Sequence, residues 1–148
     1  MAGSPLTRDQ LVDLAHRHAA VEAQGDMDAT MATLGDDPVY ELLPVGRVFR
    51  GRDAARTYYE YFFSTFRPMA RRGELRAEYT SDEGVAQEYV LYVTLPDGTE
   101  ERHPLVSVLT FGESALSGER VYASERLLRL LFGPAFDLAQ PLDWKSDR

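Results

Sequence analysis

The spacing of apolar residues divides the chain into an N-terminal part with helical periodicity and a C-terminal part with strand-like alternation. Thr7 and Gln10 have the spacing of a capping box before the first helical pattern, and Gly25 and Gly35 end the first two patterns. The predicted helices cover residues 8–24, 27–34 and 52–66. The predicted strands cover residues 38–43, 48–49, 73–81, 84–95, 99–111 and 115–124, and a short helical turn follows over 125–131.

Three helices followed by a meander of long strands predict an α+β fold, with the helices packed on one face of a curved antiparallel sheet. The 148 residues are enough for one domain, 1–148, with a core of its own. The segment after Gly133 carries Phe136, Leu138, Leu142 and Trp144. We expect this apolar tail to pack across a pocket mouth or against a neighbouring subunit.

The segment EYVLYVTLPDGTEERHPLVSV predicts a β-hairpin, because Asp97-Gly98 suits a tight two-residue loop. That loop would place Tyr92 opposite His103 and Glu88 opposite Ser107, all on one face of the sheet. A mostly apolar wall with a few converging polar groups is typical of a small-ligand pocket. Two alternatives are open: a three-residue loop with a bulge would shift the pairing, and Glu88 and His103 could lie solvated at the rim.

The opposite face of the same hairpin is also apolar. It would carry Tyr89, Leu91, Val93, Val106 and Val108. An apolar face of this size favours contact with a second subunit, so we expect a homodimer.

The amino-acid composition excludes some kinds of functional site and disfavours some kinds of partner. The formal net charge of −8, from 24 acidic and 16 basic residues, disfavours a nucleic-acid partner. The chain has no cysteine, so disulfides, thiolate metal sites and a Cys nucleophile are excluded. No apolar run approaches the length of a membrane span, and the N-terminus lacks the apolar stretch of a signal peptide. We expect a cytoplasmic protein with no membrane partner and no metal or cofactor.

Several segments of the chain follow an order known from one family. They are GDMDATMATLGDDPVYELLPVGRVFRGRDAARTYYEYFFSTF, then GVAQEYV, PLVSVLTF and ERVYASERLLRLLFG. Together they resemble the SnoaL-like polyketide cyclases and their ketosteroid isomerase relatives, over about residues 8–133. The resemblance implies the cone-shaped, cystatin-like fold of nuclear transport factor 2, a curved sheet wrapped around three N-terminal helices. The tail 134–148 lies beyond the resemblance.

The acidic residues of the family are absent at three matching positions. The resemblance places a general-base Asp at Leu43, an oxyanion-stabilising acid at Ser107 and an acid/base Asp at Ser124. The family's mechanism therefore does not transfer directly. His103 is then the candidate base, since histidine titrates near neutrality, and Glu88 the candidate second catalytic group.

Other side chains are candidates for ligand binding. Tyr92 and Ser107 could donate hydrogen bonds to a developing oxyanion. Ser124 is a further pocket candidate. Others, each with a core role as its alternative, are Tyr40, Tyr58, Tyr59, Phe62 and His18.

Three functional hypotheses follow. The first is cofactor-free cyclisation or isomerisation of a small hydrophobic carbonyl compound held in the pocket. The second is a non-catalytic ligand-binding domain, which the three missing carboxylates favour. The third is a dimeric interaction module whose interior is filled by aromatic side chains.

Overall fold

A computed structural model describes residues 4–145, and residues 1–3 and 146–148 of the predicted single domain lie outside the described residues. The helices are α1 (Arg8–Gln24), α2 (Met27–Ala32), α3 (Arg52–Tyr61), α4 (Arg67–Met69), α5 (Glu125–Phe132) and α6 (Pro134–Leu138), and a π-helical turn, η1 (Phe62–Phe66), joins α3 to α4. The strands are β1 (Leu34–Leu43), β2 (Arg47–Arg50), β3 (Arg72–Thr80), β4 (Gly84–Thr94), β5 (Glu100–Phe111), β6 (Leu116–Tyr122) and β7 (Gln140–Pro141).

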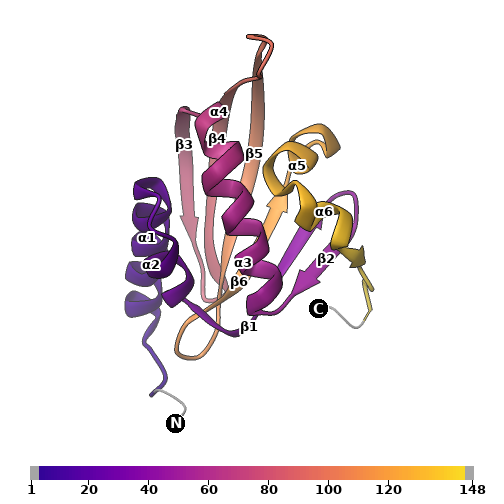
Figure 1. Cartoon of the computed structure of the whole chain (residues 1–148). Coiled ribbons are helices and arrows are strands. Elements are labelled where there is room, and N and C mark those ends of the chain that lie inside the picture. Colours follow the sequence, from indigo (N-terminus) through magenta and orange to yellow (C-terminus); the bar gives the residue numbers. More distant parts are fainter. Residues whose placement is uncertain (1–3, 146–148) are drawn as a thin grey trace.

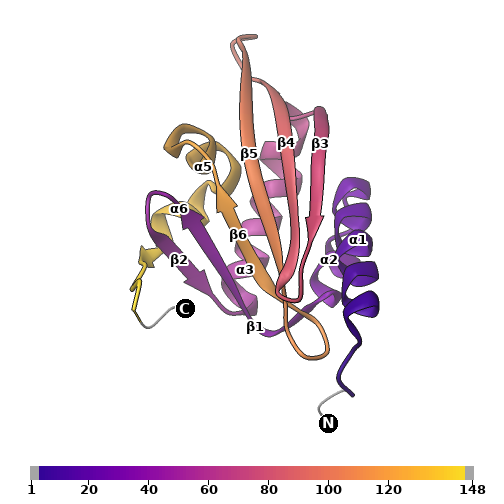
Figure 2. The same cartoon turned by 180° about the vertical axis from the view of Figure 1, so that it is seen from behind.

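The strands form one curved sheet in the order β3-β4-β5-β6-β1-β2-β7, and the helices lie on one of its faces (Figures 1 and 2). Consecutive strands from β3 to β6 pair antiparallel, whereas β1 pairs parallel with β6 and sets Tyr40 beside Glu119. The predicted α+β fold with helices on one face of a curved sheet is confirmed, with this one parallel pair added to it.

The start of the first helix follows the predicted capping box. The Gln10 amide donates to Thr7 Oγ1 over 3.2 Å, and the Thr7 amide donates to Gln10 Oε1 over 2.9 Å. These two bonds satisfy amides that have no partner within the first turn. The helix ends where predicted, at Gly25, whose φ of 74° is easily reached only by glycine.

Two predicted helix ends are wrong. The second helix stops at Ala32, because Leu34 already pairs with Leu116 in the sheet. The third predicted helix, 52–66, corresponds to α3 together with η1, but the chain stays helical beyond residue 66 through α4. Pro68 lies in the first turn of α4, where a missing amide hydrogen is tolerated, and η1 joins that turn to α3.

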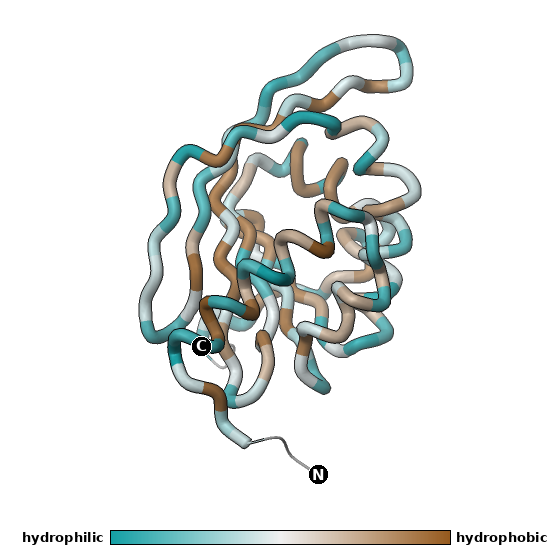
Figure 3. The backbone as a smooth tube through the Cα atoms, turned by 90° about the vertical axis from the view of Figure 1, so that its left-hand side faces the viewer, coloured by the Kyte–Doolittle hydropathy of each residue, from teal (hydrophilic) through white to brown (hydrophobic). Residues whose placement is uncertain are grey.

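The core fills the space between the sheet and the helices, and apolar positions (brown in Figure 3) recur along the strands and helices that enclose it. Tyr40 of β1 stacks on Phe49 of β2 with ring centroids 4.9 Å apart. Tyr58 of α3 contacts Phe132 of α5 at 4.5 Å. Aromatic pairs of this kind add to the stabilisation from buried area, and here they fix α3 and α5 on the inner face of the sheet.

The segment after Gly133 forms α6 and β7, which the sequence did not predict. Phe136 is buried and lies under the guanidinium of Arg47, 4.9 Å from its ring centroid. The helix α6 contacts α3 and β2, and β7 extends the sheet beside β2. Phe136 of the tail thus joins the core, Leu142 and Trp144 line a second hollow beside β1 and β6, and contact of the tail with a neighbouring subunit stays a prediction.

No helix lies over the outer face of the sheet in Figure 2, among the residues described. Tyr79 and Tyr122 are exposed there, whereas the exposed Leu75 pairs with the cavity-lining Tyr89 and so lies on the inner face at the edge of the sheet. The homodimer remains a prediction. None of the helices within residues 4–145 has the length and apolar character needed to span a bilayer.

Candidate active site

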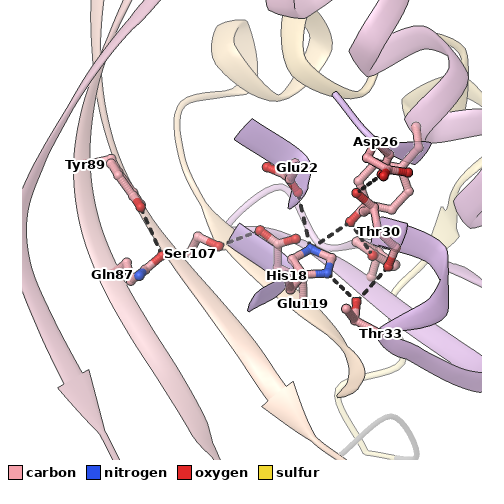
Figure 4. Close-up of polar contacts among 11 residues, drawn as sticks. His18, Glu22, Asp26, Thr30, Thr33, Gln87, Tyr89, Ser107 and Glu119 are labelled. Atoms are coloured by element: carbon pink, nitrogen blue, oxygen red, sulfur yellow. Dashed lines mark hydrogen bonds and ion pairs between the residues drawn. The ribbon is translucent and has the colours of Figure 1, made fainter. Parts of the chain in front are cut away.

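A cavity of about 340 Å³ lies between the helices and the inner face of the sheet. Its walls come from α1, from α3 with η1 and α4, and from the strands β4, β5 and β6. The lining is apolar over much of its area, with Tyr58, Phe62, Phe66, Leu91, Leu105 and Leu109. Polar side chains enter it from opposite walls. They are His18 and Glu22 on α1, and Gln87, Ser107 and Glu119 on the strands (Figure 4).

The hairpin loop decides which strand residues reach this cavity. Leu95 and Thr99 close a three-residue loop, because the Leu95 amide donates to the Thr99 carbonyl over 2.8 Å. Gly98 has a φ of 86°, as a glycine bulge in such a loop requires. Ser107 consequently lies opposite Gln87, and His103 lies opposite Leu91.

The predicted two-residue loop is therefore wrong by one residue, and the shift moves Glu88 and Tyr92 to the outer face. There Glu88 accepts a hydrogen bond of 2.9 Å from the Tyr79 hydroxyl. The Tyr92 hydroxyl donates to Glu74 over 3.2 Å. The four polar groups proposed from the sequence do not meet.

Two further predicted residues lie away from the cavity. His103 is on the same face as Ser107 but nearer the hairpin loop, with its Nε2 atom 3.5 Å from Glu101 Oε2. Ser124 caps α5, where its Oγ atom accepts a hydrogen bond from the Leu127 amide over 3.1 Å. Their proposed roles in chemistry and ligand binding have no support from this placement.

The other sequence candidates do come together. His18, Tyr58, Phe62 and Ser107 line the cavity. Tyr40 and Tyr59 are fully buried behind this lining, and their hydroxyl oxygens lie 2.8 Å apart. Leu43, where the family resemblance places a general base, is buried in a separate small apolar cluster.

Glu119 and Glu22 are the site residues that the sequence reasoning missed. Glu119 lies in the middle of β6, and its Oε1 atom accepts a hydrogen bond of 2.5 Å from the Ser107 hydroxyl (Figure 4). A usable signal was present, because Glu119 lies two residues before the buried Val121 of that strand and therefore points to the same, inward face. Glu22 follows His18 by four residues, which is one turn of the same helix face.

His18 is the centre of a buried hydrogen-bond network. The Thr33 hydroxyl donates to the Thr30 carbonyl, so it accepts from Nδ1 of His18 over 2.7 Å. This arrangement leaves Nε2 facing Glu22 Oε2 at 3.2 Å and the Tyr59 hydroxyl at 3.1 Å. One ring nitrogen is thereby fixed by the scaffold, and the other can exchange a proton with its neighbours.

The electrostatics of the cavity favour proton transfer near neutral pH. Burial is the main cause that raises the pKa of Glu119 to about 7. The negative charge of Glu22 also raises this pKa, whereas the hydrogen bond from Ser107 lowers it. Burial lowers the pKa of His18, but the hydrogen bond and charge of Glu22 outweigh it, so that the pKa lies above its ordinary value. Burial raises the pKa of Tyr58, so this phenol keeps its proton.

A Tyr59→Phe variant tests the network behind the cavity. It removes the hydroxyl that joins Tyr40 to His18 and leaves the Tyr40 hydroxyl buried without that partner. We expect the free energy of unfolding to fall by about 1–3 kcal/mol, the cost of an unsatisfied buried polar group. Urea unfolding measures it. Tyr79→Phe, on the exposed outer face, is the control, and an equal loss there would contradict the network's importance.

Among residues 4–145, no group of three or more His, Cys, Asp or Glu side chains is placed to hold a metal ion. That the chain works without a metal or cofactor stays a prediction.

Solved structures share this fold at low sequence identity. A protein from Xanthomonas campestris pv. campestris, named only as a candidate polyketide cyclase, matches with a TM-score of 0.61 and 21% identity over 82% of this chain and 95% of its own. A protein of ketosteroid isomerase-like fold from Catenulispora acidiphila, in complex with trimethylamine, matches with a TM-score of 0.59 and 16% identity over 83% and 95%. An NTF2-like protein from Anabaena variabilis matches with a TM-score of 0.63 and 15% identity over 79% and 91%.

The curated proteins include no significant sequence match to this chain. A family model does match, and it confirms the resemblance seen in the sequence. The model of the SnoaL-like domain covers residues 15–116, which include His18, Glu22 and Ser107. With that coverage and with the NTF2-like fold of its structural neighbours, this chain is a member of the SnoaL-like domain family.

Proposed function

We propose that the chain catalyses cofactor-free proton transfer on a small, largely apolar carbonyl compound, as in an isomerisation or an aldol-type cyclisation. One observation carries this proposal. Glu119 and the His18–Glu22 pair enter one apolar cavity from opposite walls, and the pKa of Glu119 lies at about 7. A carboxyl group with this pKa is present in both protonation states at neutral pH, as general acid–base catalysis requires.

In the proposed reaction, ionised Glu119 removes a proton from the carbon next to the substrate carbonyl. The C–H electron pair forms a C=C bond, and the carbonyl electrons move to oxygen to give an enolate. Protonated Glu119 then returns the proton at another carbon, which completes an isomerisation. In a cyclisation the enolate carbon attacks a second carbonyl of the same molecule, and the resulting alkoxide takes the proton.

Tyr58 is the hydrogen-bond donor that we assign to the enolate oxygen. It lines the cavity, and its hydroxyl makes no hydrogen bond with any of residues 4–145. A neutral phenol held in an apolar wall stabilises an oxyanion without needing to reorganise water. The Ser107 hydroxyl is already engaged with Glu119.

This assignment accounts for the missing acid at position 107. The family resemblance places a carboxylic acid there, and this chain has a serine. The carboxyl group comes instead from Glu119 on the neighbouring strand, which accepts a hydrogen bond from that serine. The acid is therefore displaced by one strand and remains in the same cavity.

The test uses 5-nitrobenzisoxazole, an apolar aromatic probe of general-base catalysis. Removal of its ring C–H proton breaks the N–O bond and releases a coloured cyanophenolate. We expect saturable catalysis that increases with pH through about 7, as Glu119 ionises. Glu119→Gln should lower the rate by about 100-fold or more, the usual contribution of a general base.

Two further variants sharpen this test. Glu22→Gln removes a charge that raises the pKa of Glu119, so the pH profile should move to lower pH. Glu88→Gln, on the outer face, should leave the rate unchanged. A wild-type rate no higher than that of acetate at the same pH would refute catalysis, and so would equal losses in Glu88→Gln and Glu119→Gln. If the probe bound without accelerated turnover, the non-catalytic ligand-binding domain would replace our proposal.

A further inference from the structure

Two arginines line the cavity at its helical side. Arg67 belongs to α4, and Arg71 follows it by four residues just before β3 begins. Arg71 is exposed and Arg67 is partly buried, so this side of the cavity opens to solvent. We name the pair Arg67 and Arg71 the mouth arginines.

Arg67 is held in place by the end of α1. A terminal nitrogen of its guanidinium donates to the Ala23 carbonyl, one of the last carbonyls of that helix. The group lies directly over Gly25, where a Cβ atom would come within 2.5 Å of it. A cation at this end of a helix is favoured by the helix dipole. Arg67 thus has a structural contact, but its planar group carries five N–H donors and most of them stay available.

Arg71 is more exposed than Arg67 and makes a hydrogen bond to the backbone of its own turn. Its Nε atom donates to the Pro68 carbonyl over 3.1 Å, which orients the side chain. Neither of the mouth arginines makes an ion pair with an acidic side chain among residues 4–145. The adjacent Arg72 differs, because it pairs with Glu74 at 3.6 Å and stacks on Tyr92 at 3.6 Å on the outer face.

The interior of the cavity has the opposite electrostatic character. The Glu22 carboxylate is turned inward to His18 (Figure 4) and does not neutralise the mouth arginines. The raised pKa of Glu119 shows that the interior disfavours further negative charge. An anionic group on a ligand is therefore unfavourable inside and favourable at the mouth.

We propose that the mouth arginines bind a carboxylate of the substrate. The substrate is then an apolar carbonyl compound with one carboxylate, which stays at the mouth while the carbonyl end reaches Glu119. Arginine suits this role because its planar fork matches a carboxylate with two parallel hydrogen bonds. The inference rests on the proposed function only in placing the reacting end of the substrate at Glu119.

The experiment compares two ligands of nearly the same size and shape, the anionic 4-phenylbutanoate and its neutral amide, 4-phenylbutanamide. Their dissociation constants for the full chain are measured by NMR chemical-shift titration at low and high salt. We expect the carboxylate to bind about 3- to 10-fold more tightly than the amide at low salt, as for a partly exposed charged pair. Added salt should reduce this preference.

The mouth variant is Arg71→Gln, and its matched control is Arg72→Gln on the neighbouring residue. Arg71→Gln should abolish the preference for the carboxylate and leave binding of the amide unchanged. Arg72→Gln should change neither constant. The inference is overturned if the carboxylate binds no better than the amide, if it fails to bind, or if both variants reduce the preference equally.

These outcomes are separate from those of the proposed function, because no turnover is measured. If the preference for the carboxylate were found but the benzisoxazole probe were not turned over, only the proposed function would be refuted. If the probe were turned over but the carboxylate bound no better than the amide, only the inference about the mouth arginines would be refuted.

Discussion

Replacing Glu119 with glutamine is expected to raise the free energy of unfolding at pH 8 by about 3–4 kcal/mol and to change it little at pH 4. The folded chain holds the pKa of this carboxyl at about 7, against an ordinary value of 4.5. Each unit of difference corresponds to about 1.4 kcal/mol. Glutamine keeps an oxygen that accepts the Ser107 hydrogen bond and never ionises.

The direction of this pH dependence follows from the fact that the folded state favours the protonated form of the Glu119 carboxyl. Because the folded pKa is raised, the contribution of Glu119 to stability is fully present below about pH 4.5 and is lost as pH rises through about 7. His18 acts in the same direction, since its pKa is also raised and its stabilisation is lost at higher pH. Glutamine removes the part that belongs to Glu119 and, with it, the smaller effect of the Glu119 charge on the pKa of His18, while the larger effect of Glu22 on His18 stays.

Urea unfolding at pH 4, 6 and 8 measures the effect, with Glu88→Gln as the control on the exposed outer face. The difference between Glu119→Gln and wild type should grow from pH 4 to pH 8, while the control stays near wild type throughout. A difference that did not depend on pH would mean that Glu119 titrates as an ordinary surface carboxyl.

Gly118→Ala is expected to lower the free energy of unfolding by about 3–5 kcal/mol, the range of severe backbone and packing defects. Gly118 has a φ of 140°, which residues with a side chain rarely adopt. A Cβ atom there would lie 1.9 Å from the Val39 carbonyl oxygen of the parallel neighbour β1. The atoms that this Cβ atom would meet belong to the backbone of Val39, so no flexible side chain could move aside to relieve the clash.

Gly98→Ala is the matched control, because its φ of 86° is also positive but a Cβ atom would meet open space. The free energy of unfolding of Gly98→Ala should fall by only about 1–2 kcal/mol, the cost of holding a residue with a Cβ atom at positive φ. Urea unfolding separates the two effects. Catalysis of the benzisoxazole probe should also fall in Gly118→Ala, since Glu119 is the next residue in the strand. Equal losses of stability in both variants would show that β6 and β1 can separate locally at little cost.

The local features of the fold could be predicted from the sequence because the atoms that specify them are neighbours in the chain. Thr7 and Gln10 meet within one helical turn, and Gly25 ends the helix through its own backbone. The hairpin register could not be settled in this way. Asp97-Gly98 is compatible with a loop of two or three residues, and one residue of difference exchanges the two faces of the strand.

The site was predicted in part for the same reason. His18, Tyr58, Phe62 and Ser107 were among the candidates and they line the cavity. The partner of Ser107 was missed, because Glu119 reaches it only through the pairing of β5 with β6 and through the docking of α1 on the sheet. Neither contact has a signature within a short segment of sequence.

The parallel pairing of β1 with β6 also has a consequence for the order of folding. These strands are far apart in the chain, so their contact closes a long loop, and we expect it to form late in folding. During synthesis the helix that carries His18 is complete long before the strand that carries Glu119 has left the ribosome. The two halves of the proposed acid–base site thus meet only once β6 has been synthesised, and the proposed activity would serve as a reporter of completed folding.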